Sequence, residues 1–508
     1  MTMMKQSALT IIIPVSDEQA APLRQLLTAV GQNISERAVS LSAVRERLPR
    51  TIPALTGETF IEFHKLTTVH FLRFVLLDPA RDAEGHIISA SLAFSTDYDG
   101  PLDEHLDELI RVAEPALETI FSFCNPPPAP GQLKPYLLAR QQPYAAFYCG
   151  HPGRSVRQIW GRANNSEEEL RLILERTLDQ QPRLNTPGDA IAELRKAAGQ
   201  SGWTMDPTSG RPPQILPIVW WGLAVGLLAI VALVSLVCSV PWWVSLSTIG
   251  TVIAGVVLLV GLLGTTLNAR DGSDRSREQA LLHTQGPPPD PDGSADPYVA
   301  DRSSRRLTIV TDLEDQRGLV QNQMTHIVNI RPGSLRLFTL RLVLGVINFL
   351  ARTVFVRGKL GDIETIHFAR WVLIDDNRRL MFFSNYDFSW DSYLGDFIDL
   401  ASDGLTGIWC NTTFFPQTRI PAWDFIPRAF RLLRPMQSNQ PATRLFEQGA
   451  RREQAFKKWT RDHQTPTHVW YSAYPHLSVT NVNGNSTIAA GLNESLSGKD
   501  LDAWLRKL

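Results

Sequence analysis

The sequence lacks paired cysteines, a charge imbalance and a secretion signal. Its four cysteines, Cys124, Cys149, Cys238 and Cys410, form no CxxC pair and no zinc-site spacing, which argues against a disulfide framework and fits a reducing compartment. A formal net charge of −1 leaves no electrostatic footprint for nucleic acid. The opening residues, MTMMKQSALTIIIPVS, hold too short an apolar run for a signal peptide. At 508 residues, the chain is too long for one core and predicts two or three domains.

Familiar catalytic motifs are also missing. No P-loop, GxSxG, HExxH or kinase-type motif occurs in the sequence. The sequence is therefore more informative about architecture than about chemistry.

Charged residues are absent from the whole stretch between Arg211 and Arg270. Within it, residues 215–240 and 246–267 are each long and apolar enough to cross a bilayer as a helix. The joint PWWVS contains a helix-breaking proline and two tryptophans, which favour the headgroup level. This pattern predicts a transmembrane hairpin; the alternative is a buried helical pair in a soluble core.

A hairpin of two spans places both flanking domains on the same side of the membrane. Arg211 precedes it, and Arg270, Arg275 and Arg277 follow it, so the positive-inside tendency makes that side cytoplasmic. We therefore expect a protein of the bacterial inner membrane, with two spans and both domains in the cytoplasm.

Similar words occur in the same order on both sides of the hairpin. TVHFLRFVLLD (68–78) and TIHFARWVLID (365–375) share seven of eleven residues. We also matched residues 9–30 with 307–328 as a strand followed by an amphipathic helix. The remaining matches join residues 91–110 with 379–398, and 147–161 with 470–484. These matches predict an internal duplication.

Each copy is expected to follow the β-α-β-β-α-β order of a ferredoxin-like domain. Pro101 and Ser389 stand where the second helix of each copy should begin. The fold class is α+β, with two tandem ferredoxin-like domains forming a pseudo-dimer. The expected boundaries are copy one at 1–185, a linker at 186–213, the hairpin at 214–268, a flexible linker at 269–305 and copy two at 306–508.

The strand at 365–375 is apolar on both faces, with His367, Ala369 and Trp371 alternating with Phe368 and Arg370. Helices can cover one face, so the other needs a second layer, for which the sheet of the sister copy is the obvious candidate. This arrangement is similar to the dimeric α+β barrel superfamily, which includes the dye-decolourising peroxidases and chlorite dismutases. A resemblance of fold does not fix a function.

Residues 331–361 break the symmetry, because they hold six basic residues and no acidic one. We interpret this segment as a basic apolar insertion that lies on an anionic membrane surface. The alternative is a core helix with solvated arginine tips. The expected membrane-surface residues are Arg336, Arg341, Arg352, Arg357 and Lys359.

Two corresponding polar sets are the candidate catalytic residues. They are His70, Arg73, Asp97 and Asp99 in copy one, and His367, Arg370, Asn385 and Asp387 in copy two. The similarity to the peroxidases implies a haem ligated by histidine, with arginine and aspartate assisting, although their GxxDG-type motif is missing. The structural interpretation is favoured: Arg73 clamped by Asp99, and Arg370 by Asp387. GHPGR (150–154) and NGNST (483–487) are interpreted as turns.

The second-half words GDIETIHFARWVLIDD, SNYDFSWDSYLGDFID, TGIWCNT, FPQTR and VWYSAYPHLSV resemble those of an uncharacterised family of bacterial membrane-anchored proteins. The resemblance spans most of 361–479 and implies no activity and no catalytic residues.

We therefore expect a membrane-anchored cytoplasmic binding or scaffold protein of unknown ligand. The alternative is a haem-dependent peroxidase-like oxidoreductase with its site between the two sheets. A weaker alternative is a lipid-binding or lipid-modifying protein. The expected partners are the bilayer, anionic lipid headgroups and further copies of the chain, with no nucleic acid.

Overall fold

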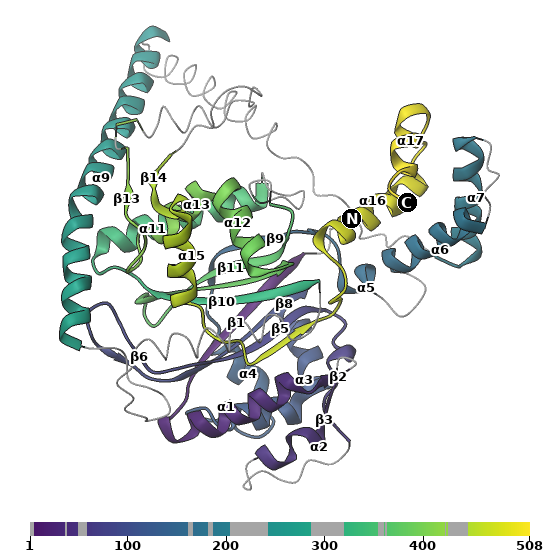
Figure 1. The fold of residues 1–508 in the computed structure, drawn as a ribbon, viewed down its shortest axis with the longest axis horizontal. Helices are drawn as coiled ribbons and strands as arrows, with labels where there is room; N and C mark the ends of the chain where they lie inside the picture. Colours follow the sequence, from purple (N-terminus) through teal and green to yellow (C-terminus); the bar gives the residue numbers. More distant parts are fainter. Residues whose placement is uncertain are drawn as a thin grey trace.

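Two four-stranded antiparallel sheets form the centre of the protein, which is therefore of the α+β class (Figure 1). The computed structural model describes residues 5–35, 38–48, 58–160, 166–180, 186–203, 242–285, 320–353, 360, 363–421, 423–424 and 445–508. The predicted first span, 215–240, lies outside these residues. The second, 246–267, lies inside one long helix, α9 (Trp242–Gln285).

The first sheet takes three strands from the first half of the chain, namely β1 (Gln6–Pro14), β5 (Val69–Leu77) and β8 (Ser91–Asp99). The second takes three from the second half, namely β10 (Gln321–Asn329), β11 (Ile366–Ile374) and β12 (Arg379–Asp387). Their aromatic and β-branched content suits buried strands, and all nine residues of β5 are buried.

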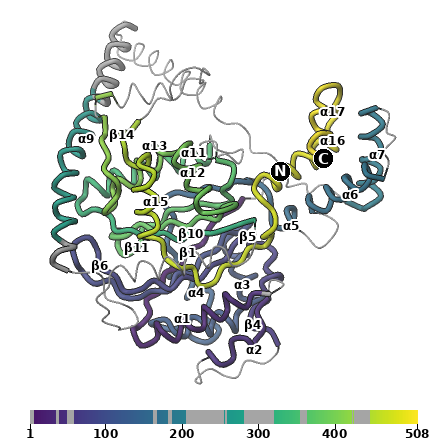
Figure 2. Tube along the Cα trace, in the orientation of Figure 1, coloured from purple at the N-terminus to yellow at the C-terminus, as the bar shows by residue number. Residues whose placement is uncertain are grey.

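The fourth strand of each sheet comes from the opposite half of the chain. Strand β9 (Tyr144–Cys149) pairs with β11, and β15 (Val469–Ser472) pairs with β5 (Figure 2). The strand orders are therefore β1-β8-β5-β15 and β10-β12-β11-β9. The boundary between the halves of the sequence is thus not the boundary between the sheets.

We call β9 and β15 the exchanged strands. The residues just before each of them also join the two sheets at their edges. Gln141, just before β9, forms a bridge with Ile11 of β1, and Gln464, just before β15, forms one with His326 of β10. The eight strands consequently close on themselves as a flattened barrel. Side chains from the two facing sheets form one apolar cluster, which fills the space between them. Its members are Val75, Leu77, Ala93, Val372, Ile374, Met381 and Phe383.

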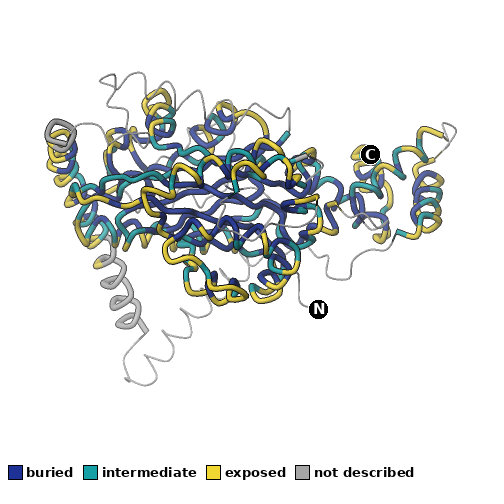
Figure 3. Tube along the Cα trace, turned by 90° about the horizontal axis from the view of Figure 1, so that it is seen from below, coloured by how far each residue is buried: buried dark blue, intermediate teal, exposed yellow. Residues whose placement is uncertain are grey.

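Helices cover the outer face of each sheet, and the buried residues concentrate in the layers between them (Figure 3). On one side lie α1 (Asp17–Gln32), α3 (Leu102–Phe121) and α4 (Leu133–Leu138). On the other side lie α11 (Ser334–Thr353), α12 (Trp390–Leu400), α13 (Ser402–Trp409) and α15 (Glu453–Asp462) (Figure 1).

The predicted starts of two of these helices are confirmed. Pro101 is the N-cap of α3, and Ser389 is the N-cap of α12, where its hydroxyl accepts the Ser392 N–H. Acidic residues follow in the first turn of each helix, where they oppose the positive end of the helix dipole.

The smaller elements complete the chain. A three-stranded sheet of β2 (Ile34–Ser35), β3 (Ala38–Ser40) and β4 (Thr59–Ile61) adjoins α2 (Leu41–Val44). Two short pairs are β6 (Ala80–Arg81) with β7 (Ile87–Ile88), and β13 (Thr418–Arg419) with β14 (Glu447–Gln448).

A separate helical module lies beside the barrel, at the end far from α9 (Figure 1). Leucine and isoleucine side chains from both halves of the chain form its core. It consists of α6 (Glu167–Gln180), α7 (Pro187–Gln200), α16 (Val479–Asn493) and α17 (Gly498–Leu505). The interpretation of residues 483–487 as a turn is wrong, because they lie inside α16.

One expectation about the start of the second half is also wrong. Residues 321–328 form strand β10, not an amphipathic helix. Its register matches that of β1, since Gln6 lies opposite Asp99 and Gln321 opposite Asp387. In the order of the chain, α11 lies between β10 and β11, as α1 lies between β1 and β5.

Candidate functional site

A β-bulge in each central strand changes the direction of its histidine. The pairing of β5 with β8 shifts between Val69 and Phe71, and that of β11 with β12 shifts between Ile366 and Phe368. His70 and His367 are the extra residues, so they escape the strict alternation of a strand. Strand alternation alone had placed His367 and Arg370 on opposite faces; the bulge was not visible in the sequence.

His70 links an aspartate of its own half to a tyrosine of the other half. Its Nε2 lies 2.9 Å from Asp99 Oδ1, and its Nδ1 lies 2.7 Å from the Tyr474 hydroxyl. Because an ionised carboxylate only accepts, Nε2 carries the proton and Nδ1 accepts from the tyrosine. Tyr474 reaches this position because it follows the exchanged strand β15.

His367 has the reciprocal arrangement. Its Nε2 lies 2.8 Å from Asp387 Oδ1, and its Nδ1 lies 3.4 Å from His151 Nε2. His151 follows the exchanged strand β9 and also approaches the Tyr474 hydroxyl, at 3.2 Å. A continuous hydrogen-bonded series thus crosses between the halves. We call it the histidine chain: Asp99, His70, Tyr474, His151, His367 and Asp387.

Backbone amides hold both ends of the histidine chain. Asp99 Oδ2 accepts the N–H of Val156 at 2.8 Å, and Asp387 Oδ2 accepts the N–H of Val479 at 2.8 Å. These amides begin α5 (Val156–Ile159) and α16. Each carboxylate therefore has an amide donor and an imidazole donor, which offset the cost of burying its charge.

His151 is the central histidine and remains neutral. Burial, together with the neighbouring His70 and His367, holds the pKa of its imidazole well below the ordinary value. Its Nδ1 is buried without a hydrogen-bond partner, as expected when Nε2 carries the single proton. The neutral ring can donate to Tyr474 or to His367 from that nitrogen.

The two central arginines cross from one sheet to the other. Arg73 donates to the carbonyl oxygens of Met324 at 2.9 Å and Ser384 at 3.1 Å. Arg370 donates to the carbonyl oxygen of Thr96 at 2.8 Å and to the Ser95 hydroxyl. Each guanidinium therefore binds backbone and side-chain oxygens of the opposite half.

The Asp97 carboxylate interacts with both arginines, directly with Arg370 and through Asn385 with Arg73. Asp97 Oδ1 lies 3.3 Å from Arg370 Nη1, and Asp97 Oδ2 accepts the Asn385 amide at 3.0 Å. Asn385 Oδ1 in turn accepts from Arg73. Burial and the charge of Arg370 lower the pKa of Arg73 to about 9, and burial raises the pKa of Asp97. We call Arg73, Arg370, Asp97 and Asn385 the arginine cluster.

The predicted arginine clamps are wrong. Asp99 and Asp387 bind the histidines of their own halves. Arg370 pairs instead with Asp97, and Arg73 binds Asn385 and backbone oxygens of the second half. The bulges explain the difference, because they bring each histidine to the aspartate at the end of the adjacent strand.

Sequence reasoning missed His151 and Tyr474. His151 was interpreted as part of a turn, and Tyr474 was quoted only inside a longer match. The signal was present, since the matched blocks FYCGHPGRSV and WYSAYPHLSV place these two residues at the same position. A polar aromatic ring at one aligned position after both exchanged strands indicates a common buried partner.

The candidate catalytic residues are enclosed. His70 and His367 are fully buried, and Arg73, Asp99, Arg370 and Asp387 are at most 4% exposed. Both ring nitrogens of His70 and both ring nitrogens of His367 already have a hydrogen-bond partner. A haem between the sheets does not fit this arrangement, because apolar side chains fill that space and neither histidine has a nitrogen left for iron.

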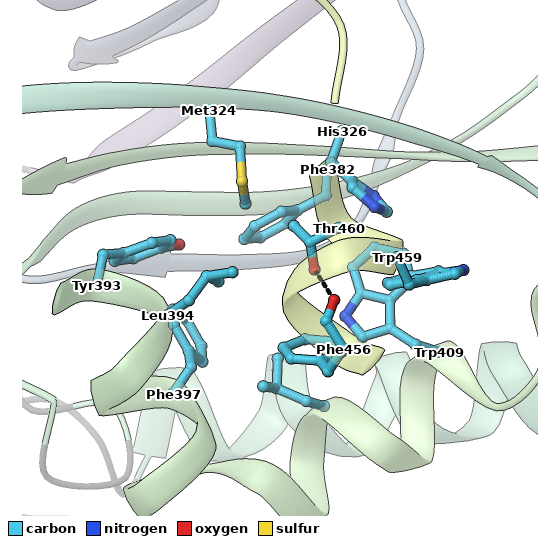
Figure 4. Close-up of a pocket in the computed structure, with 11 residues that line it drawn as sticks. Met324, His326, Phe382, Tyr393, Leu394, Phe397, Trp409, Phe456, Trp459 and Thr460 are labelled. Carbon is cyan, nitrogen blue, oxygen red and sulfur yellow. Dashed lines mark hydrogen bonds between the residues drawn. The ribbon is translucent and has the colours of Figure 1, made fainter. Parts of the chain in front are cut away.

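A small cavity of about 20 Å³ lies between the second sheet and the helices that cover it (Figure 4). No residue of the histidine chain lines it. Its lining is apolar and comes from β10, β12, α12, α13 and α15. Met324, Phe382, Trp409, Phe456 and Trp459 contribute, and His326 lies at its edge (Figure 4). It has room for about one water molecule, so it is a packing defect of the core and not a substrate site.

Asp82, Glu84 and His86 are the one carboxylate and histidine group within the described ranges that is compact enough for a metal ion. Asp82 Oδ1 accepts the N–H groups of Glu84 and His86, both at 2.9 Å. These hydrogen bonds stabilise the turn that joins β6 and β7, so the group has a structural explanation without a metal ion.

The predicted membrane-surface residues divide into three groups. Arg336 is 2% exposed and lies 2.8 Å from Asp274 of α9, so its guanidinium is not available to a headgroup. Arg341 and Arg352 are exposed on α11. Arg357 and Lys359 lie outside the described residues.

Removing the Tyr474 hydroxyl tests the histidine chain. Tyr474→Phe should lower the free energy of unfolding by about 1–3 kcal/mol, because it leaves buried nitrogens of His70 and His151 without this partner. Tyr148→Phe is the matched control: this hydroxyl is also buried but has no hydrogen-bond partner, so its loss should be nearly neutral. Chemical unfolding of both detergent-solubilised variants gives the comparison, and equal stabilities would contradict a role for the hydroxyl.

Comparisons with protein-family models, curated proteins and solved structures give no match for this chain. The function must therefore be inferred from the site and the surfaces of the protein itself.

Proposed function

We propose that this protein is a membrane-anchored, non-catalytic binding or scaffold module. In this proposal, residues 215–240 and 246–267 span the bacterial inner membrane, and the barrel lies on the cytoplasmic side. The observation that carries it is the enclosure of the histidine chain and the arginine cluster. Their groups bind one another across the two halves, so they join the halves and are not presented to a substrate.

The proposal includes a duplication of one ferredoxin-like unit, with the last strands exchanged. Equal registers support it, because Gln6 pairs opposite Asp99 as Gln321 pairs opposite Asp387. Reciprocal contacts also support it, since Arg73 and Arg370 each bind backbone oxygens of the other half. The exchanged strands would make the two units one inseparable body, as a scaffold requires.

The peroxidase alternative is not favoured by the geometry, because the intersheet space is filled. Lipid contact is favoured by one finding. Helix α11 is long and apolar enough to cross a membrane, judged by length and composition alone. Only 22% of its most apolar window is buried inside the protein.

Two measurements on the full chain test the proposal. The protein should stay in the membrane pellet after alkaline carbonate extraction. After incubation with haemin, the detergent-purified protein should show no stoichiometric Soret band. Extraction into the supernatant would overturn the anchor. A Soret band lost in His367→Ala but kept in His86→Ala, an exposed control, would overturn the non-catalytic assignment.

A further inference from the structure

Exposed apolar side chains gather on one part of the protein. Of the 15 large apolar residues exposed in the described ranges, eight lie on α9, on α11 or at Trp423. We call this set the α9–α11 surface. It consists of Leu258, Leu259, Leu262, Phe338, Leu342, Val346, Phe349 and Trp423.

On α11 the exposed apolar residues form one stripe. Phe338, Leu342, Val346 and Phe349 are 49–59% exposed and recur at spacings of three or four, which places them on one side of the helix. The opposite side is buried through Leu340 and Leu344 and packs near β9. With 20 residues, the helix is ~30 Å long.

Buried ion pairs fix the beginning of α11 against α9. Arg331 lies 2.7 Å from Asp271 and 2.8 Å from Glu278, and Arg336 lies 2.8 Å from Asp274. Asp271 follows Leu267, the last residue of the apolar stretch, by about one helical turn, or ~6 Å. The start of α11 is thereby held just beyond the apolar part of α9.

Trp423 contacts α9 inside the apolar stretch, ten residues or ~15 Å before Asp271. Its ring lies against Gly261 of α9, where an added Cβ would come within 2.5 Å of it. Asn268 then joins this loop to α9 through two bonds with Ile420, at 2.6 and 2.9 Å. Trp423 is 54% exposed, so its ring adds to the apolar surface beside this stretch.

The arrangement of the helices places these features on one side. Helix α11 begins beside α9 and runs across the layer that contains α12 and α13 (Figure 1). Helix α9 extends past this layer (Figure 1). The opposite layer, with α1, α3 and α4, lies on the far side of both sheets (Figure 1). The exposed stripe and the apolar end of α9 therefore belong to the same side of the protein.

We propose that α11 lies in the plane of the membrane, with its stripe among the acyl chains and Arg341 and Arg352 at the headgroups of an anionic leaflet. This inference rests on the proposed membrane anchor. Charge favours the bilayer over a second protein as the occupant, because residues 331–361 contain no acidic residue and anionic lipids attract such helices. The continuity with α9 favours it as well.

Photocrosslinking of the full chain tests this position. The photoreactive residue p-benzoylphenylalanine replaces Phe349 in one variant and Leu138 in the other. Leu138 is a matched control, since it is 43% exposed but lies on α4 in the opposite helix layer. The protein is reconstituted in vesicles of phosphatidylcholine and phosphatidylglycerol, and the adducts are identified by mass spectrometry.

We expect several-fold more lipid adducts from position 349 than from position 138. We also expect phosphatidylglycerol among the adducts above its share of the vesicle lipid, with this enrichment lost in Arg341→Gln/Arg352→Gln. Adducts with residues 215–240 or with a second copy, in place of lipid, would overturn the inference. So would equal yields at the two positions, or adducts that follow the vesicle composition in the parent protein. Carbonate extraction separates these outcomes from failure of the anchor, because an anchored protein without lipid adducts refutes the position of α11 alone.

Discussion

Asp97→Asn should lower the free energy of unfolding by about 3–5 kcal/mol, because it removes the one carboxylate between two buried guanidinium groups. Arg73 and Arg370 both lie over the Phe383 ring, at 4.9 and 5.3 Å from its centroid. Without Asp97, their mutual repulsion would be left uncompensated in a medium of low dielectric constant. Equilibrium unfolding of the detergent-solubilised chain measures the loss.

The matched control is Asp462→Asn. Asp462 pairs with Lys458 at 2.6 Å on the exposed side of α15, and such i,i+4 pairs contribute only about 0.3–0.5 kcal/mol. Asp97→Asn/Asn385→Asp supplies a rescue, since it moves the carboxylate to the equivalent position beside Arg73. We expect this double variant to recover most of the loss. If Asp97→Asn costs no more than Asp462→Asn, the arginines do not need the carboxylate.

Acid should destabilise the protein steeply below about pH 6.5. Burial lowers the pKa of His105 and that of His468 to about 3, and holds the pKa of His151 well below its ordinary value. All three remain neutral when folded, whereas an unfolded histidine takes up a proton near pH 6.5. The unfolded state therefore binds about three more protons, and the stability contributed above pH 6.5 is lost as the pH falls toward 3. The slope is about 4 kcal/mol per pH unit.

Urea unfolding midpoints at pH 7, 6 and 5 measure this slope. Asp97, whose pKa burial raises, opposes it with one proton at the acid end, so the upper part of the range is the informative one. His105→Gln should remove about a third of the slope, and the exposed control His86→Gln should leave it unchanged. A midpoint that is constant from pH 7 to 5 would contradict the neutral burial of the three histidines.

Local patterns were sufficient for the strands and for the second helix of each half. The alternation at 365–375 and the helix starts at Pro101 and Ser389 depend on neighbours within a few residues, and they were predicted with little error. Residues 321–328 were expected to be helical because LTIVTDLED, at the start of the same match, looks like LTIIIPVSD. The less similar QNQMTHIVN provides the strand. The clear similarity of LTIVTDLED therefore hid the weaker strand pattern of QNQMTHIVN, the segment that pairs with β12.

The partners of the site could not be read from periodicity. A bulge at His70 or His367 is a property of the pairing between two strands, so neither strand alone records it. The exchange of β9 and β15 is likewise decided by which sheet edge offers hydrogen bonds. The residues of the site were largely named from the sequence, but their pairing was not, because it depends on contacts such as Tyr474 with His70 that join distant parts of the chain.

The strand exchange also determines when the protein can be completed during synthesis. Strand β9 leaves the ribosome at Cys149, more than 200 residues before its partner β11 ends at Ile374. At ordinary translation rates of about 5–20 residues per second, this gap lasts on the order of 10–45 s. The interval between the synthesis of β5 and that of its partner β15, which ends at Ser472, is longer still. The first half therefore keeps an unpaired strand and an open sheet edge while the residues of the predicted hairpin are being made. During this period a chaperone or the membrane insertion machinery would have to shield the exposed edge.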